Sequence, residues 1–151
     1  MRIALFQPDI PQNTGTILRL AACMAVGVDI IEPCGFVFGD KRMRRAGMDY
    51  LEGVDIVRHE SWEVFQKTSM AAAQRIVLLT TRSDRLYTDF TFQANDVLLL
   101  GRESAGAPEE VHQAADARLT IPMAEGMRSI NVAISGALVL GEALRQTKTF
   151  P

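Results

Sequence analysis

Short runs of apolar, mostly β-branched or leucine side chains recur along the chain, and they limit its fold more than any other feature. Five of them are almost continuously apolar: RIALF (2–6), VDIIE (28–32), RIVLLT (75–80), DVLLLG (96–101) and ARLTIP (117–122). A weaker sixth run is VDIVRH (54–59). Because the apolar residues do not alternate with polar ones, these runs are predicted to be strands of a parallel sheet buried on both faces.

Helical stretches separate these runs, over residues 13–27, 61–73, 108–115 and 129–146. Asn13 is the predicted N-cap of the first helix and Gly27 its end, and Ser61 is the predicted cap of the second. Strands that alternate with helices predict an α/β fold, a mostly parallel sheet with helices on both faces. With 48% hydrophobic and 23% charged residues, a chain of 151 residues is expected to form a single domain, 1–151, without a disordered linker.

The closing helix carries apolar side chains around most of its circumference. Gly136 and Gly141 allow another backbone to approach it closely. The apolar positions are Ile130, Ala133, Ile134, Ala137, Leu138, Leu140 and Leu144. A helix that is apolar nearly all round is buried on several sides. Two interpretations stay open: a central core helix of a monomer, or a helix with one side in an interface between subunits.

Candidate binding residues are sought at the carboxyl ends of the predicted strands, where parallel α/β sheets bind their ligands. The glycine spacing in GRESAG (101–106) matches a phosphate-binding loop, but Ala107 and Pro108 stand where its lysine and hydroxyl residue belong. Ser104 lacks the glycine two residues before it that a nucleophile elbow requires. No G-x-G-x-x-G follows the first strand, so a dinucleotide-binding motif is absent as well.

The two histidines and two cysteines argue against two further kinds of chemistry. His59 and His112 fall in stretches typical of ordinary surface or strand-edge positions, so a Ser-His-Asp triad is not expected. With Cys23 predicted to be a buried core thiol and Cys34 a candidate free one, metal ligands are too few and too scattered. The N-terminal apolar run is too short for a signal peptide or a membrane span, which favours a reducing, cytoplasmic setting.

The loops at the strand ends can form a pocket with few titratable groups. Gly101 ends a buried strand and lets a ligand approach backbone amides, while Ile121 and Met123 add apolar walls. Ser129 and Asn131 add small polar groups at a helix start. Such a pocket suits a flat, mostly neutral group such as adenine. Taken singly, these residues are more simply interpreted as turn residues.

One basic segment stands out in a chain whose formal net charge is −2. Four of the sixteen Lys and Arg residues fall within five positions: Lys41, Arg42, Arg44 and Arg45. Clusters of this kind neutralise nucleic-acid phosphates. Charge alone favours a solvated helix face that binds nothing, and RNA binding is preferred only together with the motifs that follow.

Three segments resemble, in order, the three motifs of the SPOUT superfamily of S-adenosylmethionine-dependent RNA methyltransferases: PDIPQNTGTILRLAA, LLLGRESAG and IPMAEGMRSINVAISGA. IEPCGF followed by DKRMRRAGMDY is similar to the small tRNA 2′-O-methyltransferases of the TrmL (YibK) type, which act on the wobble nucleotide. The resemblance runs from about Ile3 to Gln146. It implies methyl transfer to the ribose 2′-OH of cytidine or uridine 34, in leucine tRNA isoacceptors.

The resemblance also implies a fold, an assembly and a cofactor site. The expected fold is a Rossmann-like sheet whose C-terminal segment threads a deep trefoil knot. The expected assembly is a homodimer with the first and last helices in its interface. By motif position, S-adenosylmethionine is expected to contact Leu79, Gly101, Ile121 and Ser129, with Met123 nearby.

For the RNA, the resemblance implies contacts at Asn13 and Arg19 of the first motif. The anticodon stem-loop is expected to dock on the basic segment and on Arg128. Arg19 is the expected catalytic residue. Because a guanidinium stays protonated in proteins, a role holding a phosphate is preferred to a role as the base. Glu103 is expected either to orient its loop or to face the sulfonium, and Asn131 to support the site.

Two departures from the best-known members of this superfamily bear on these contacts. The second motif has Arg102 where proline is usual and Ser104-Ala105 where Thr-Arg is usual, so its arginine has in effect moved. In the closing helix, Gly141 and Leu144 replace an aromatic pair. Two rival functions stay open: a SPOUT enzyme acting on another tRNA or rRNA position, and an RNA-binding protein without catalysis.

Overall fold

The computed structural model describes residues 1–39, 41–47 and 53–151, with residues 44, 46 and 47 described by their backbone alone. Within these ranges the strands form one parallel sheet: β1 (Arg2–Phe6), β2 (Gly27–Ile31), β3 (Ile56–His59), β4 (Ile76–Leu79), β5 (Val97–Leu100) and β6 (Ala117–Leu119). The helices are α1 (Pro11–Cys23), α2 (Lys41–Gly47), α3 (Trp62–Ala71), α4 (Glu109–Ala114), α5 (Val132–Thr147) and the short 3₁₀ helix η2 (Tyr87–Asp89). The predicted α/β fold with a mostly parallel sheet is confirmed.

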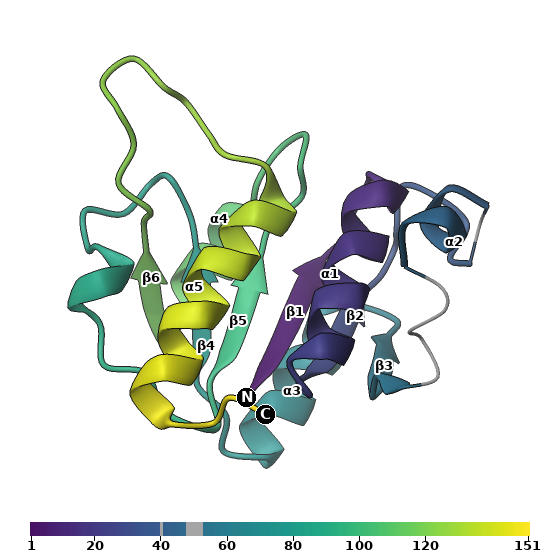
Figure 1. Cartoon of the computed structure of the whole chain (residues 1–151), viewed down its shortest axis with the longest axis horizontal. Helices are drawn as coiled ribbons and strands as arrows, with labels where there is room; N and C mark the ends of the chain where they lie inside the picture. The colour runs from purple at the N-terminus through teal and green to yellow at the C-terminus, as the bar shows by residue number, and fades with distance from the viewer. Residues whose placement is uncertain (40, 48–52) are drawn as a thin grey trace.

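The order of the strands places a switch point next to the first strand. The sheet reads β3-β2-β1-β5-β4-β6 (Figure 1). The chain moves outward from β1 to β3 on one side, and the later strands lie on the other side. β1 and β5 therefore meet where the order reverses, in a register that runs from Arg2 opposite Val97 to Leu5 opposite Leu100. Open parallel sheets bind ligands outside the carboxyl ends of the strands near such a point.

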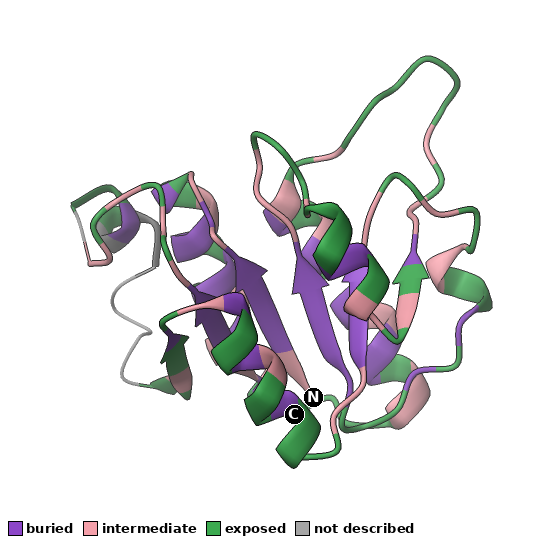
Figure 2. Ribbon diagram, turned by 180° about the vertical axis from the view of Figure 1, so that it is seen from behind, coloured by how far each residue is buried: buried purple, intermediate pink, exposed green. Residues whose placement is uncertain are grey.

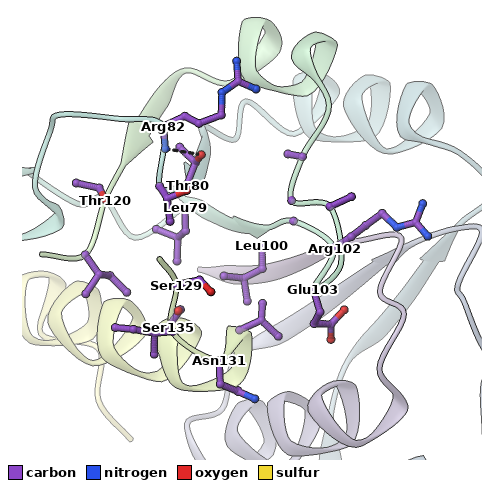
Figure 3. Close-up of a pocket in the computed structure, with 18 of the residues that line it drawn as sticks. Leu79, Thr80, Arg82, Leu100, Arg102, Glu103, Thr120, Ser129, Asn131 and Ser135 are labelled. Carbon is purple, nitrogen blue, oxygen red and sulfur yellow. Dashed lines mark hydrogen bonds between the residues drawn. The ribbon is translucent and has the colours of Figure 1, made fainter. Parts of the chain in front are cut away.

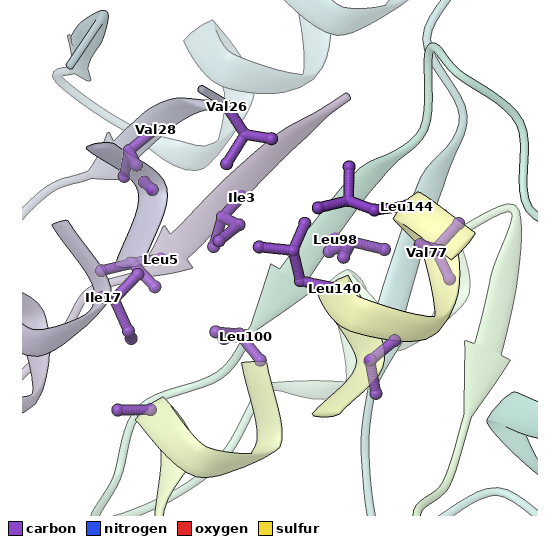
Figure 4. Packing of buried hydrophobic residues seen from close by; sticks show 14 of the residues in the cluster. Ile3, Leu5, Ile17, Val26, Val28, Val77, Leu98, Leu100, Leu140 and Leu144 are labelled. Atoms are coloured by element: carbon purple, nitrogen blue, oxygen red, sulfur yellow. The ribbon is translucent and has the colours of Figure 1, made fainter. Parts of the chain in front are cut away.

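The core consists of two layers, because successive side chains of a strand point to opposite faces of a sheet. One layer joins the sheet to α1 and α5 and includes Ile3, Leu5, Ile17, Val77, Leu98, Leu140 and Leu144 (Figure 4). The other joins it to α3 and α4 and includes Ala4, Phe6, Trp62, Phe65, Leu99 and Val111. The four inner strands are buried on both faces, as predicted (Figure 2). β6 was predicted to be buried in the same way, but it is an edge strand and partly exposed.

The helix boundaries differ from the prediction at both ends of α1 and at the start of α5. α1 ends at Cys23, and Gly27, its predicted end, is the first residue of β2. α1 begins at Pro11 and has no side-chain cap, so Asn13 is not its N-cap but lies within its first turn. Proline suits a first helical position, because its missing N–H would have no partner there. α5 is capped instead by Asn131, whose Oδ1 accepts hydrogen bonds from the N–H groups of Ala133 and Ile134 at 2.8 and 3.3 Å. Each asparagine thereby keeps a side chain near the carboxyl edge of the sheet.

The cysteines and histidines lie in surroundings that differ from those predicted. Cys23 is exposed, not buried, because it lies about 200° around α1 from the buried Ala21. Cys34 is a free thiol, as expected, and burial raises its pKa to about 11. His59 and His112 are 4% and 3% exposed, so neither is a surface residue.

A buried carboxylate joins the first three strands. Asp29 of β2 is 5% exposed, and its Oδ1 lies 2.7 Å from Nε2 of His59 on β3. Its Oδ2 accepts a hydrogen bond from Nε of Arg2 on β1 at 2.6 Å. The same guanidinium also pairs with the exposed Asp55. Arg2 is therefore held by one buried and one exposed carboxylate, which allows the two to be compared.

We expect Asp29→Asn to lower the free energy of unfolding by about 3 kcal/mol, because it leaves the Arg2 charge without its buried partner. Asp55→Asn is the matched control. Its side chain is 69% exposed, so its loss should change the free energy by about 1 kcal/mol or less. Urea denaturation measures both values, and equal losses in the two variants would contradict the assignment.

Candidate functional site

A cavity of about 500 Å³ lies at the carboxyl ends of β4, β5 and β6 (Figure 3). Its walls come from the segments that follow these three strands, from the start of α5, and from Ile10 and Asn13 beside β1. The cavity thus reaches the switch point between β1 and β5. Its volume falls within the range of small-molecule sites.

All five predicted cofactor contacts line this cavity: Leu79, Gly101, Ile121, Met123 and Ser129. They follow three different strands, and the parallel pairing of β4 with β5 and β6 brings their carboxyl ends together. Asn13, Glu103 and Asn131 line the same cavity. The segments at the ends of these strands therefore converge on one cavity. Interpreting each residue separately as an ordinary turn residue does not predict this convergence.

A chain of hydrogen bonds connects the three motif segments at the wall of the cavity. Glu103 Oε1 accepts a hydrogen bond from Nδ2 of Asn13 at 3.2 Å, and Oε2 accepts one from the Asp9 N–H at 3.0 Å. Asn13 Oδ1 in turn accepts a hydrogen bond from Nδ2 of Asn131 at 2.9 Å. The Glu103 carboxylate is thus engaged by the loop after β1, a contact that the loop-orienting alternative for Glu103 requires.

Asp9, Ser104 and Arg102 form further polar contacts, outside this hydrogen-bond chain, that also hold the loop after β5. Asp9 accepts a hydrogen bond from the Ser104 hydroxyl and lies 3.8 Å from Nε of Arg102. Its contact with the Glu103 carboxyl lowers the pKa of Asp9. Burial, followed by the Asp9 contact, raises the pKa of Glu103.

Gly101 lines the cavity and also allows the loop after β5 to close. A Cβ at this position would lie 2.6 Å from the carbonyl carbon of Gly106 and 2.7 Å from the Ala107 nitrogen. The loop closes there through paired backbone hydrogen bonds between Arg102 and Gly106, at 3.0 and 2.8 Å. A side chain at this position would therefore meet protein backbone first, so Gly101→Val would disturb the loop as well as the cavity.

Sequence reasoning missed several polar residues of the cavity wall. Thr80 and Arg82 follow β4, and the Thr80 hydroxyl accepts a hydrogen bond from the Arg82 N–H at 3.1 Å (Figure 3). Their position after a buried strand was the signal that could have found them. His112 of α4 also lines the cavity. No sequence signal marked it, because it lies within a helix whose exposed neighbours are acidic or amide residues.

The predicted RNA-binding residues other than Asn13 lie outside the cavity wall. Arg19 is exposed on α1, six residues and so about 9 Å along the axis from Asn13. Lys41, Arg42 and Arg45 are exposed on α2, while the Arg44 side chain lies outside the described residues. Figure 1 shows α2 beside α1, at the end of the sheet where the strand arrows point. Arg128 is exposed in the long loop between β6 and α5.

The described residues contain no group of three or more His, Cys, Asp or Glu side chains placed to hold a metal ion. No helix in the described ranges has the length and hydropathy needed to cross a membrane.

Known proteins match this chain along nearly its whole length. The sequence profile of the SpoU rRNA Methylase family matches residues 1–141. A protein of Beijerinckia indica subsp. indica named tRNA (cytidine(34)-2'-O)-methyltransferase is 57% identical over 144 residues, which cover 95% of this chain and 90% of that protein.

Solved structures also match this chain over nearly its whole length. One, described as "Structural insights into the 2-OH methylation of C/U34 on tRNA", has a TM-score of 0.91 and 35% identity, and the match covers 96% of this chain and 94% of that one. An AdoMet-bound rRNA methyltransferase from Sinorhizobium meliloti has a TM-score of 0.88 and 30% identity, over 95% of this chain and 55% of that one. The resemblance inferred from the three motifs is confirmed, and the chain belongs to the SpoU rRNA methylase family.

Proposed function

We propose that this protein is a tRNA 2′-O-methyltransferase that transfers a methyl group from S-adenosylmethionine to the ribose 2′-OH of cytidine or uridine 34. The main support is the convergence of the three motif segments on one cavity, beside a basic helix, in a member of the SpoU family. The 57% identical relative is named for the same reaction on cytidine 34. We place the reaction in the cytoplasm and its substrates among the leucine tRNA isoacceptors.

The cavity fits the cofactor in size and in chemistry. Its floor and walls combine apolar side chains such as Leu79, Ile121 and Met123 with the backbone of the loop that begins at Gly101. This mixture suits a nucleoside that is partly flat and apolar and partly polar. When bound, S-adenosylmethionine supplies an electrophilic methyl group on a positively charged sulfur. Leu79, Gly101, Ile121, Met123 and Ser129 would hold it and exclude water.

The chain's own residues then have to align the ribose. We assign Arg19 to hold an RNA phosphate on the α1 side of the cavity, and Asn13 to position the nucleotide at the cavity edge. Alignment of the 2′-oxygen, the methyl carbon and the sulfur raises the rate, because the reacting groups have already lost on binding the freedom that they would otherwise lose in the transition state. Loss of the hydroxyl proton is assisted by the bound phosphate or by the local field. Asn131 supports this arrangement through Asn13.

We further propose a homodimer whose interface includes α5 and α1. Ile134 is 55% exposed and Leu138 43% exposed on one side of α5. The opposite side of α5 packs on the sheet, with Leu140 and Leu144 buried. α1 lies beside α5, so the two helices can form one continuous surface (Figure 1). An interface on this surface would account for the apolar circumference of the closing helix.

Residues 1–151 are proposed to form one SPOUT domain closed by a deep trefoil knot. The connection from β4 to β5 lies on the same face as α5, where Gln146 bonds to the backbone of Phe90 and Phe92, each at 3.0 Å. The chain reaches α5 from the edge strand β6, so it has to pass this connection. A solved structure in which residues 121–131 pass outside residues 80–96 would contradict the knot.

The function is tested by incubating the protein with total tRNA and methyl-labelled S-adenosylmethionine, followed by mass spectrometric mapping of the product. We expect a 2′-O-methyl group on nucleotide 34 of leucine tRNAs. Label at another tRNA position, or in rRNA offered separately, would replace this substrate with the rival one. Binding of tRNA without any transfer of label would support an RNA-binding protein that lacks catalysis.

Arg19→Ala should separate binding from chemistry. We expect cofactor affinity to stay unchanged and turnover at saturating tRNA to fall by about 100-fold or more, because positioning of the 2′-OH acts in the transition state. Lys67→Ala, on the far face of the sheet, is the control for loss of one exposed charge. Full turnover of Arg19→Ala at saturating tRNA would remove its catalytic assignment.

The combined replacement of Arg42, Arg44 and Arg45 should weaken tRNA binding through phosphates. Each lost contact should reduce the slope of log affinity against log salt by roughly 0.7 to 0.9. Cofactor affinity serves as the internal control, since α2 does not line the cavity. An unchanged salt slope would instead indicate that the basic cluster is a solvated helix face that does not bind RNA.

Ile134→Glu combined with Leu138→Glu should convert the dimer to a monomer, because two charges would be buried in an apolar interface. Met70→Glu on α3 is the matched control, since Met70 is 71% exposed and lies on the other face of the sheet. Light scattering at micromolar concentration measures the mass. A monomeric parent protein under the same conditions would contradict the proposed assembly.

A further inference from the structure

His112 is a buried polar side chain of the cavity to which the reaction assigns no task. It lies on α4, is 3% exposed and lines the cavity. Within the described part of the chain, no hydrogen bond reaches either of its ring nitrogens. The fully enclosed polar atoms without a partner there are Asp9 Oδ1 and Arg102 Nε. The His112 ring nitrogens are not among these enclosed atoms, so part of the small solvent-accessible surface of His112 belongs to them.

The other histidine shows how this protein accommodates a buried imidazole that only packs. Nε2 of His59 lies 2.7 Å from Asp29 Oδ1, and its ring packs edge-on against Phe65 at 5.2 Å. Buried side-chain polar groups are nearly always paired in this way. His112 differs because it faces a cavity, so its partner can come from whatever occupies that cavity.

Three charged groups lie around His112: Arg82 from the segment after β4, Glu109 from the same helix and Arg118 from β6. Burial, and then the charge of Arg82, lowers the pKa of His112 and so favours its neutral form. Glu109, which is paired with Arg82 at 2.6 Å, acts in the opposite direction. A neutral imidazole offers one hydrogen-bond donor and one acceptor.

We propose that His112 is a specificity contact for the cofactor, hydrogen-bonding a polar group of the bound nucleoside through its neutral imidazole. This inference rests on the proposed function, in which the cavity takes S-adenosylmethionine. Protonation of the ring would remove its acceptor and add a positive charge beside Arg82 and beside a cationic ligand. Cofactor affinity is therefore highest above the pKa of the imidazole and is lost as the pH falls through it.

Calorimetric titration with S-adenosylhomocysteine between about pH 5.5 and 8.5 tests the contact, because histidine titrates in this range. We expect the affinity of the parent protein to fall toward low pH. His112→Gln keeps a donor and an acceptor but does not titrate, so it should bind within a few fold of the parent with a flat pH profile. His112→Leu should bind about 3- to 10-fold more weakly at pH 8, the usual effect of one lost hydrogen bond.

Nuclear magnetic resonance of the unmodified protein provides an independent readout that needs no variant to fold as the parent does. The chain has two histidines, so its spectrum contains two imidazole Hε1 signals, which His112→Gln assigns. Addition of S-adenosylhomocysteine should lower the pKa of His112 and leave the position of the His59 signal unchanged. His59 is a suitable internal control because Asp29 holds it outside the cavity wall.

The outcomes separate this inference from the function on which it rests. Binding of S-adenosylhomocysteine with an unmoved His112 signal, and with equal affinities of the leucine and glutamine variants, would overturn the contact alone. Absence of binding at every pH would overturn both the contact and the proposed methyltransferase. A pH-dependent affinity that survives in His112→Gln would assign the titration to another group and would also overturn the inference.

Discussion

The hydrogen-bond chain from Glu103 through Asn13 to Asn131 is the interaction on which the site depends. It joins the loop after β5, the first turn of α1 and the cap of α5, which are far apart in the sequence. Each such bond contributes only about 1 kcal/mol to stability. Its larger effect is geometric, since it fixes three walls of one cavity relative to one another.

Each member of this chain is satisfied on two sides, which makes the arrangement specific. Asn131 caps α5 with its oxygen and donates to Asn13 with its nitrogen. Asn13 donates to Glu103 with the nitrogen of the same amide. An aspartate at Asn13 could accept but not donate, so it would face the Glu103 carboxyl without a proton between them. The amide is therefore required at that position by both neighbours.

Much of the fold could be predicted from the sequence, because the information was local. The inner strands are continuous apolar runs, and Ser61 caps α3 as predicted, with its side chain accepting from Val64 N–H at 3.4 Å. Errors arose where a neighbour distant in the sequence decides the outcome. From the sequence, His59 is predicted to be a strand-edge residue, but in the structure it is buried against Asp29 of the adjacent strand. β6 has an apolar pattern but no second neighbour to cover it.

The candidate site was likewise predicted where the information is local in the sequence and missed where it depends on distant neighbours. The three motifs identified the walls of the cavity, because the parallel sheet brings the ends of neighbouring strands to one edge. They could not identify His112, since its role depends on which side of a short helix meets the cavity. They also did not predict the close return of the loop to Gly101, because the positions of Gly106 and Ala107 are not encoded in the glycine itself.

Charge is distributed along the same edge of the sheet. The basic helix α2 lies beside α1 at the carboxyl ends of the strands, although the chain as a whole has a net charge of −2. A local cluster steers a polyanion to one face, and an acidic remainder disfavours binding elsewhere. α1, which carries Asn13 and Arg19, lies beside this basic helix, and in the proposed function the RNA would approach the cavity from this side.

The displaced arginine of the second motif, Arg102, lines the cavity and also contacts the loop after β1. Arg102 NH1 lies 3.4 Å from Oε1 of Gln7, and Nε lies 3.8 Å from Oδ2 of Asp9. Gln7 has a φ of 44°, a left-handed conformation that non-glycine residues rarely adopt, so a contact that restrains this turn is useful there. Figure 3 shows the guanidinium of Arg102 pointing away from Leu79 and Ser129. The departure from the usual motif therefore places an arginine at the junction between the loops after β1 and β5.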